Sequence, residues 1–281
     1  IPFVYMLNPE TTFPMDGNYT PFPKGFSENC VLAVPSDAIN DYKNDDVFGL
    51  WKTIIPIDSI PANYGQIIDV DNILYKVGFD RLSVAGYNGD GTDVDLVIPS
   101  VVTHDNRYYS VAYIEDNAFY QKAFRTAIIE EGIAKLGNRA FEDCASLIKV
   151  SLPNTLKEIG ESAFSCDYAL KSIDIPDGVT TIGNSAFNGC TSITSIKIPD
   201  SVTTIGNSAF SGCESLTSVE IPDSVTTIGN SAFGHCDSLT SVTIGDSVTT
   251  IGDRAFCYCN NLTSVVVGNN VENIGSEAFA D

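Results

Sequence analysis

The sequence predicts a repeat solenoid, rich in β-strand with short helical turns, in which units of 23 residues stack one on another. Residues 198–220 read IPDSVTTIGNSAFSGCESLTSVE, the next 23 read IPDSVTTIGNSAFGHCDSLTSVT, and 19 of the 23 positions are identical. An Ala-Phe pair recurs first after 22 residues and then six times after 23, at Phe119, Phe141, Phe164, Phe187, Phe210, Phe233, Phe256 and Phe279. A unit of this length cannot bury its apolar face alone, so the units must stack.

Each unit contains a short strand. Residues 216–221, LTSVEI, alternate and are rich in β-branched side chains, which favours a strand. Pro222 ends the strand because proline cannot donate to a ladder, and Asp223 and Ser224 suit a turn. Stacked strands of this kind form a parallel sheet with roughly 4.8 Å between rungs, where a rung is one turn of the solenoid.

The rest of the unit predicts a second set of buried residues and a turn. Val225 and Ile228 are the apolar anchors, and Gly229 permits a backbone conformation that a side chain would hinder. Asn230 is placed to cap a short helical turn that carries the Ala-Phe pair.

The repeat pattern IPDSVTTIGNSAFxGCxSLTSV closely resembles the leucine-rich repeats of the BspA-like surface proteins, also called the Treponema type. The resemblance runs from Ile114 to the end of the chain. It implies a leucine-rich-repeat solenoid of about seven units over residues 119–281, without a closing segment at the C-terminal end. It also implies surface display and adhesion, and it suggests an anaerobic gut or oral bacterium as the source.

The residues before the array divide into two further segments. Residues 61–118 resemble the β-rich cap that opens such arrays, with Asp105 and Asn106 as a hairpin turn between VVTH and RYYSV. Residues 1–60 resemble the segment that closes a preceding array, with Ser36 placed to cap a short helix.

The ends of the chain suggest a piece of a longer protein. Ile1 is an unusual first residue, and Asp281 follows the last Phe of the repeat by two residues. Solenoids generally need polar caps at exposed ends. We therefore expect a trimmed chain, or a last rung covered by a neighbour, which includes end-to-end self-association through the unclosed C-terminal repeat.

Composition and charge exclude several classes of function. The chain is 43% hydrophobic and 18% charged, which is typical of a folded protein with a sizeable core. Its formal charge is −21, and after Lys197 a single basic residue, Arg254, accompanies ten acidic ones. We expect neither a nucleic-acid partner nor docking on an anionic membrane, because both need clustered Lys and Arg. No window approaches 18 consecutive apolar residues, so no direct membrane insertion is expected.

Five cysteines share one repeat position, three residues after a repeated Phe, namely Cys144, Cys190, Cys213, Cys236 and Cys259. A disulfide stack, a metal ladder or a small core residue would each place Cys there. Stacked rungs hold the thiols parallel, which suits neither the torsion of a disulfide nor the converging ligands of zinc, so the core role is favoured. Cys166 lies one place off this ladder and Cys257 forms a CxC with Cys259; the sequence leaves the redox state of these three open.

No catalytic residue, cofactor site or metal site is predicted. The chain has no phosphate loop, dinucleotide fingerprint, H-E-x-x-H or G-x-S-x-G motif. His104 lies near the predicted hairpin turn, and His235 replaces a glycine of earlier units. No Cys or Ser is placed by sequence to use either histidine as a base, so a surface role is favoured for both.

The acidic loop 88–95, NGDGTDVD, faintly resembles a calcium loop. Thr92 and Asp93 depart from the third-ligand and glycine positions of the EF-hand, and Pro99 stands where a bidentate Glu belongs. A solvated turn is therefore favoured over an adventitious cation site.

In each strand, two side chains flank the central buried residue and should project from the exposed face of the sheet. The first column is nearly all Ser or Thr, and it reads Thr126, Lys149, Ser172, Ser195, Ser218, Ser241 and Ser264. The second column changes at almost every rung, and it reads Ile128, Ser151, Asp174, Lys197, Glu220, Thr243 and Val266. The candidate binding residues are Lys149, Asp174, Lys197, Glu220 and Thr243, and the alternative is a merely solvated face.

These features predict a non-enzymatic recognition and adhesion module, extracellular or on the cell surface. Its partner would be a protein or glycoprotein of a host or neighbouring cell, bound through the exposed sheet face. A passive spacer that displays another domain is the alternative. A polysaccharide-active enzyme is less favoured, because the carboxylates of Asp174 and Glu220 lie two rungs apart with Lys197 between them.

Overall fold

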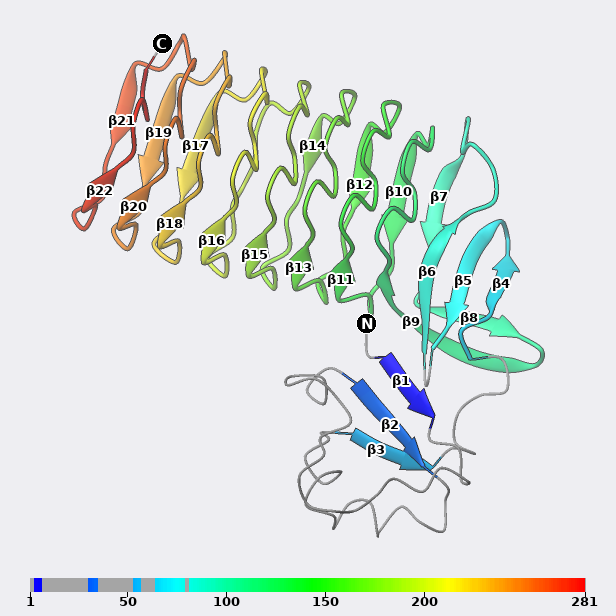
Figure 1. Cartoon of the computed structure of the whole chain (residues 1–281). Coiled ribbons are helices and arrows are strands. Elements are labelled where there is room, and N and C mark those ends of the chain that lie inside the picture. Colours follow the sequence, from blue (N-terminus) through cyan, green and yellow to red (C-terminus); the bar gives the residue numbers. More distant parts are fainter. Residues whose placement is uncertain (1–2, 7–29, 35–52, 57–63, 79–80, 281) are drawn as a thin grey trace, which may run out of the picture. The chain divides into compact units, whose positions relative to one another are not determined.

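The computed structural model describes residues 3–6, 30–34, 53–56, 64–78 and 81–280 (Figure 1). The chain divides into two compact units, Ile1–Tyr64 and Gly65–Asp281. The first unit contains a parallel sheet in the order β1 (Phe3–Met6), β2 (Cys30–Val34) and β3 (Thr53–Pro56). Val31 pairs with Thr53, 22 residues further on. The helix expected at Ser36 lies outside the described residues, and the origin of residues 1–60 in a preceding array stays a prediction.

The second unit opens with a β-rich cap, which contains β4 (Ile67–Val70), β5 (Ile73–Val77), β6 (Arg81–Tyr87), β8 (Val101–His104) and β9 (Arg107–Ile114). The first three strands form an antiparallel meander. The predicted hairpin between β8 and β9 is confirmed, since Asp105 and Asn106 have φ of 49° and 59° and His104 pairs with Arg107. Two residues with positive φ match the twist of a two-residue hairpin. β9 then pairs in parallel with β6 and with the first rung of the array.

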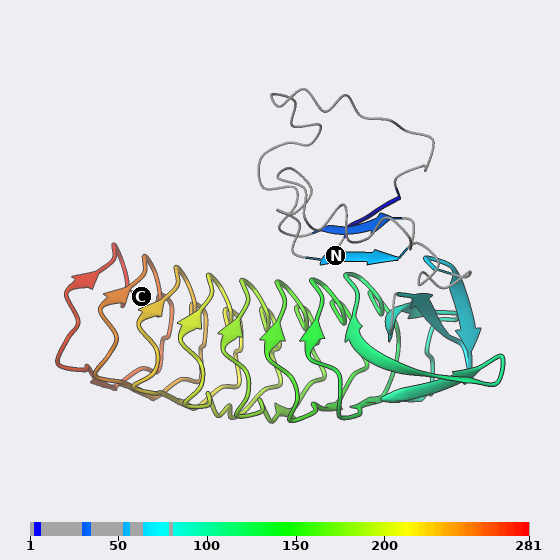
Figure 2. The same ribbon diagram turned by 90° about the horizontal axis from the view of Figure 1, so that it is seen from below.

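Two parallel sheets run along the array that follows (Figures 1 and 2). The first, called here the face sheet, contains β7 (Asp95–Ile98), β10 (Thr126–Ile129), β12 (Lys149–Ser151) and β14 (Ser172–Ile173), and after an interruption β17 (Ser218–Ile221), β19 (Ser241–Ile244) and β21 (Ser264–Val266). The second, called the back sheet, continues from β9 through β11 (Lys135–Leu136), β13 (Glu158–Ile159), β15 (Thr181–Ile182), β16 (Thr204–Ile205), β18 (Thr227–Ile228), β20 (Thr250–Ile251) and β22 (Asn273–Ile274). Paired residues such as Glu220 and Thr243 are 23 positions apart, which confirms the predicted solenoid.

A stack of phenylalanine rings fills the core between the sheets. The rings of the repeated Phe residues from Phe119 to Phe279 lie 4.9 to 5.4 Å apart, centroid to centroid, and all are within 24° of parallel. The rings from Phe119 to Phe256 are buried. Each ring therefore covers the next, and the stack gains the burial of about 150–250 Å² that a large aromatic side chain contributes.

The turn that carries the Ala-Phe pair is not helical, so the prediction of short helical turns is wrong. The main-chain N–H groups of Ser231, Phe233 and His235 donate to carbonyls of the next rung at 2.7 to 2.8 Å. Those of Ala232 and Gly234 donate within the turn, at 3.3 and 3.0 Å. A helix needs consecutive N–H groups to bond within their own segment. Here every second main-chain N–H group donates to the next rung instead. Ser231 has a φ of 53°, which allows this alternation.

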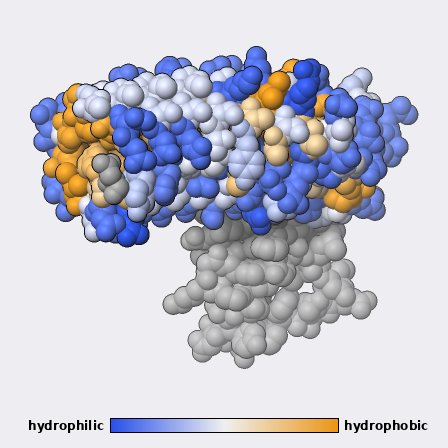
Figure 3. Space-filling model, turned by 90° about the horizontal axis from the view of Figure 1, so that it is seen from above, coloured by the Kyte–Doolittle hydropathy of each residue, from blue (hydrophilic) through white to orange (hydrophobic). Residues whose placement is uncertain are grey.

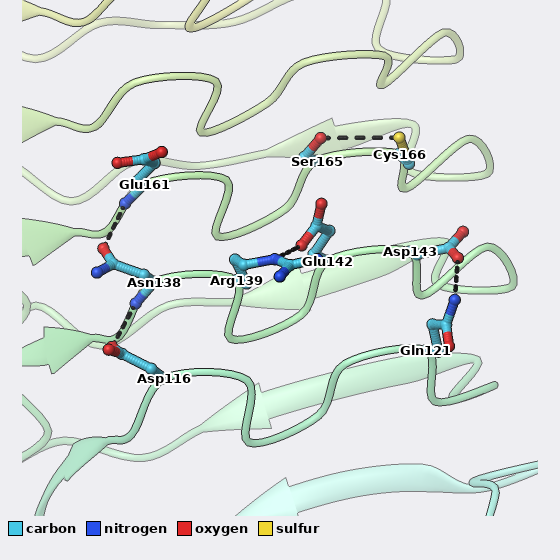
Figure 4. Close-up of polar contacts among 9 residues, drawn as sticks. All are labelled: Asp116, Gln121, Asn138, Arg139, Glu142, Asp143, Glu161, Ser165 and Cys166. Atoms are coloured by element: carbon cyan, nitrogen blue, oxygen red, sulfur yellow. Dashed lines mark hydrogen bonds and ion pairs between the residues drawn. The ribbon is translucent and has the colours of Figure 1, made fainter.

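Asn230, predicted to cap a helix, instead joins two rungs. Its Oδ1 accepts a hydrogen bond from the main-chain N–H of Asp253 at 2.9 Å. Figure 4 shows the same contact in earlier rungs, where the N–H of Asn138 donates to Asp116 Oδ1 at 2.8 Å and that of Glu161 donates to Asn138 Oδ1 at 2.9 Å. Short polar side chains at this position satisfy main-chain donors that would otherwise lack a partner.

The glycine after each aliphatic anchor is required by the close approach of successive rungs. A Cβ on Gly229 would lie 2.6 Å from the carbonyl carbon of Gly206, and a Cβ on Gly206 would lie 2.7 Å from that of Gly183. The φ of these glycines is not positive. The reason for glycine is therefore backbone-to-backbone contact, rather than the conformational freedom that the sequence suggested.

We expect Gly206→Ala to lower the free energy of unfolding by about 2–3 kcal/mol, because the new methyl group must push two rungs apart. Gly234→Ala is the matched control, since its Cβ would meet nothing closer than 3.5 Å. Chemical denaturation followed by circular dichroism measures both variants. Equal midpoints for the two variants would contradict this account of the repeated glycine.

Candidate functional site

The predicted exposed face exists. The central residue of each face-sheet strand from β10 to β19 is buried, whereas the predicted binding residues Lys149, Asp174, Lys197, Glu220 and Thr243 are all exposed. This outcome follows from the alternation of side chains along a strand. The register that the repeat predicted therefore places these five side chains on one surface.

The face sheet is interrupted in its middle. Residues 195–198 form no strand, so the described sheet ends at β14 and resumes at β17. The main-chain bonds on this side are long from Lys171 onward, at 3.4 Å from Lys171 to Ile148, 3.4 Å from Thr194 to Lys171 and 3.3 Å from Thr217 to Thr194, against 2.9 Å from Thr240 to Thr217. The back sheet keeps bonds of 3.0 and 3.1 Å over the same rungs. Strand pairing is therefore lost over this rung on the face side only.

A cavity of about 630 Å³ lies where the face sheet is interrupted. Lys197, Glu220 and Thr243 line it, so the structure brings three of the five predicted residues together at one site. Lys149 and Asp174 are exposed on the same sheet but do not line the cavity. The sequence reasoning missed the turn residues that complete the wall, which are Asp200, Asp223 and Ser224. They follow the strand in the repeat, and that position is the signal that could have found them.

The cysteine ladder is a core feature, as favoured from the sequence. All five cysteines are buried, and none of the five is in a disulfide. Each donates to the carbonyl of the repeated Phe in the preceding rung, at 3.0 to 3.4 Å. Burial raises the pKa of Cys144 and Cys190 and raises that of Cys213 to about 12, so these thiols stay protonated near neutral pH.

One rung replaces this cysteine with a buried carboxyl, which the sequence reasoning missed. Asp167 stands three residues after Phe164, at the position that Cys occupies in the neighbouring rungs. Its Oδ1 accepts a hydrogen bond from the N–H of Cys144 at 2.8 Å, while its buried Oδ2 has no partner. Burial raises the pKa of the Asp167 carboxyl well above its usual range. The sequence signal for this replacement of Cys by Asp was that Cys166 lies one position before the place where the ladder cysteine belongs.

The remaining candidates are explained by local contacts. His235 is exposed and stacks on Tyr258 at 4.7 Å, and His104 Nε2 lies 3.4 Å from Asp105 Oδ2. In the acidic loop, Asp90 Oδ1 accepts from the N–H of Thr92 at 2.9 Å, which lowers the pKa of Asp90. Among the described residues, no group of three or more His, Cys, Asp or Glu side chains is placed to hold a metal ion. In the same part of the chain, no helix has the length and apolar character needed to cross a membrane.

The stacked rungs, the phenylalanine core and the exposed polar sheet face define a repeat protein of the leucine-rich-repeat class. Such proteins are generally modules for protein interaction or surface display. The chain belongs to the BspA-type leucine-rich-repeat family, whose model, described as "BspA type Leucine rich repeat region", matches residues 112–199 and 180–281. The resemblance predicted from the repeat is thereby confirmed.

Solved structures of bacterial leucine-rich-repeat proteins are similar to the chain. The leucine-rich-repeat protein of T. pallidum, TpLRR, is 28% identical with a TM-score of 0.49, over 76% of this chain and 85% of that one. A leucine-rich-repeat protein of Eubacterium ventriosum has the same fold, with 19% identity and a TM-score of 0.52 over 90% of this chain and 59% of that one. A leucine rich cell surface protein of Faecalibacterium prausnitzii is 18% identical with a TM-score of 0.34, over 74% of this chain and 96% of that one. No curated protein matches the chain.

Thiol labelling tests the two environments of cysteine. Cys166 is only half-buried, lies at a turn residue with φ of 62°, and has its Sγ 3.7 Å from Ser165 Oγ (Figure 4). We expect Cys166→Ser to remove about one fast-reacting equivalent of thiol from the native chain, because accessible thiols react before buried ones. Cys190→Ser should leave the fast phase unchanged. Loss of the fast phase in the Cys190 variant alone would contradict the structure.

Asp167 is expected to make stability fall with rising pH. Its folded-state pKa is raised, so the folded chain holds a proton that the unfolded chain releases above about pH 4, and the free energy of unfolding declines from there upward. Asp167→Cys restores the ladder and should add about 1–3 kcal/mol at pH 7, and less at pH 4. Asp174→Asn, an exposed acid of the same rung, is the control. A gain that is independent of pH would contradict the assignment.

Proposed function

We propose that the chain is a non-enzymatic recognition module that binds a protein or glycoprotein of a host or neighbouring cell through its face sheet. The observation that carries the proposal is the combination of a repeated core with a variable exposed column. Asp174, Lys197, Glu220 and Thr243 occupy equivalent positions on successive rungs and differ in charge and size. A repeat that keeps its buried residues and varies its exposed ones can change its ligand without changing its fold.

The cavity supports the proposal because recognition sites are generally concave. Three of the predicted binding residues line it, and Ser and Thr hydroxyls of both columns surround it. Catalysis is not favoured by this arrangement, because Asp174 and Glu220 are separated by the rung that carries Lys197. A location outside the cell is part of the proposal and is supported by membership of the BspA-type family.

The exposed side of the last rung is a second candidate surface for binding. Its exposed apolar residues are Val265, Val266, Val267, Ile274 and Phe279, and Figure 3 shows apolar atoms gathered at this end of the array. A further repeat of the same chain and a second molecule are both compatible with such a face. End-to-end self-association through it therefore stays a prediction.

The first test is a binding screen of the chain against extracellular-matrix proteins, mucins and bacterial glycans at physiological salt. We expect a saturable hit. A well-folded chain that binds nothing in the screen would favour the alternative, a passive spacer that displays another domain.

The second test neutralises four charged side chains of the face sheet, two of each sign, so that the net charge stays the same. Lys149→Gln, Asp174→Asn, Lys197→Gln and Glu220→Gln together should weaken binding of the ligand found in the screen by about tenfold or more, because they remove the varied side chains from the contact surface. The matched control neutralises two cations and two anions of existing ion pairs off the face sheet, Lys135 with Glu158 and Arg254 with Glu277. Equal affinity of the two variants for the ligand would exclude the face as the site.

A further inference from the structure

We propose that the cavity in the face sheet binds a cationic side chain, of the arginine or lysine kind, from an extended segment of a protein partner. The inference rests on the proposed function and names the chemistry of its ligand. It is carried by unpaired acidic groups on the cavity wall, by a buried hydroxyl without a partner, and by the interruption of the sheet around them.

The carboxylates of the cavity lack cationic partners. Asp200, Glu220 and Asp223 line the wall, and none of them forms an ion pair with another described residue. Lys197 is the one cation of the lining, and its Nζ lies 3.8 Å from Asp177 Oδ1 in the preceding rung rather than in an ion pair with these three acids. The wall therefore carries three carboxylates against one amine, and a cationic ligand can pair with the excess of negative charge.

Asp223 on the wall and Asp246 in the next rung show what an acid at this repeat position does when the next turn packs against it. The N–H of Asp246 donates to Asp223 Oδ1 at 2.7 Å, and the N–H of Asn269 donates to Asp246 Oδ1 at 2.9 Å. In the opened part of the stack, Asp200 receives no such bond from the described residues. Its carboxylate is left with its full capacity to accept hydrogen bonds.

The buried hydroxyl of Ser224 is a second, independent sign of an unfilled site. In the rung before it, Ser201 Oγ donates to the carbonyl of Val179 at 2.6 Å. Ser224 is the equivalent residue 23 positions later, yet its Oγ is buried and has no hydrogen-bond partner. A buried polar group without a partner destabilises the folded chain, and a ligand that bonds to it would remove that cost.

A guanidinium or ammonium group matches this wall. Guanidinium presents five N–H donors in a plane and can bond a carboxylate through two of them. Ser224 Oγ is buried as it stands and would accept a further one only after its side chain turns toward the cavity. Pro222 also lines the cavity, is part-exposed, and offers an apolar surface for the methylene stem of such a side chain. Beyond Lys197 only Arg254 is basic, so the field of this half of the array attracts a cationic segment rather than an anionic one.

The test measures binding of a labelled peptide, acetylated and amidated at its ends, with the sequence Gly-Arg-Gly-Arg-Gly-Arg. Asp200→Asn with Glu220→Gln removes two wall charges, and neither side chain makes a hydrogen bond or ion pair in the described structure that the change would break. Glu214→Gln with Glu272→Gln is the matched control, since both acids are exposed and lie outside the cavity lining. We expect fluorescence anisotropy to show about tenfold weaker binding for the first pair and a change within about twofold for the control.

Lys197→Gln provides a gain-of-binding test. Because it removes the one positive charge on the cavity wall, we expect it to tighten binding of the same peptide by about threefold. Equal losses for the two acidic pairs would overturn the proposal, since they would show only a general attraction to an acidic chain. Binding of an uncharged oligosaccharide with the same dependence on Asp200 and Glu220 would also overturn it, by assigning the cavity to a polyol.

The outcome separates this inference from the proposed function. If a macromolecule from the screen binds through the face but the arginine peptide does not bind, the ligand class is wrong and the recognition module stands. If the peptide binds at the cavity but no macromolecule binds, the cavity assignment stands and the recognition function fails.

Discussion

The contact on which this structure depends is the stacking of each rung on the equivalent residues of the next. The phenylalanine rings lie 4.9 to 5.4 Å apart along the core, and the main chain of each turn donates to the turn that follows it. A residue such as Gly206 must therefore suit its own rung and both neighbours. This explains why the sequence repeats so closely, since a side chain that fits one interface fits them all.

The same constraint makes departures from the repeat informative. Asp167 replaces a small thiol with a buried carboxyl, which we expect to lower stability at neutral pH and which offers no ligand an accessible surface. The opening at residues 195–198 differs, because it loosens only the face sheet while the Phe stack and the back sheet continue through it. A solenoid with two sheets can tolerate such an interruption, because the strand pairs of the back sheet still fix the register of successive rungs.

Much of this arrangement could be predicted from the sequence, but not all of it. The period predicted the buried and exposed positions, and Glu220 and Thr243 are exposed as the alternation requires. The helical turn was wrong because local propensity at Asn230 is overruled by bonds between rungs. The interruption at residues 195–198 could not be predicted, since SIKI is as strand-like as SVEI.

The position of the cavity shows how a uniform scaffold can present a local site. The core beneath it keeps the same Ile, Val, Ala and Phe residues as its neighbours, so the site adds no irregularity to the packing. What changes is the exposed column and the closure of the turn beyond it, where Asp200 and Ser224 lack the bonds that other rungs make. Substitutions confined to those positions would alter charge and shape at the surface at little cost to folding. Under the proposed function, recognition and stability would therefore fall to different residues of the same 23-residue unit.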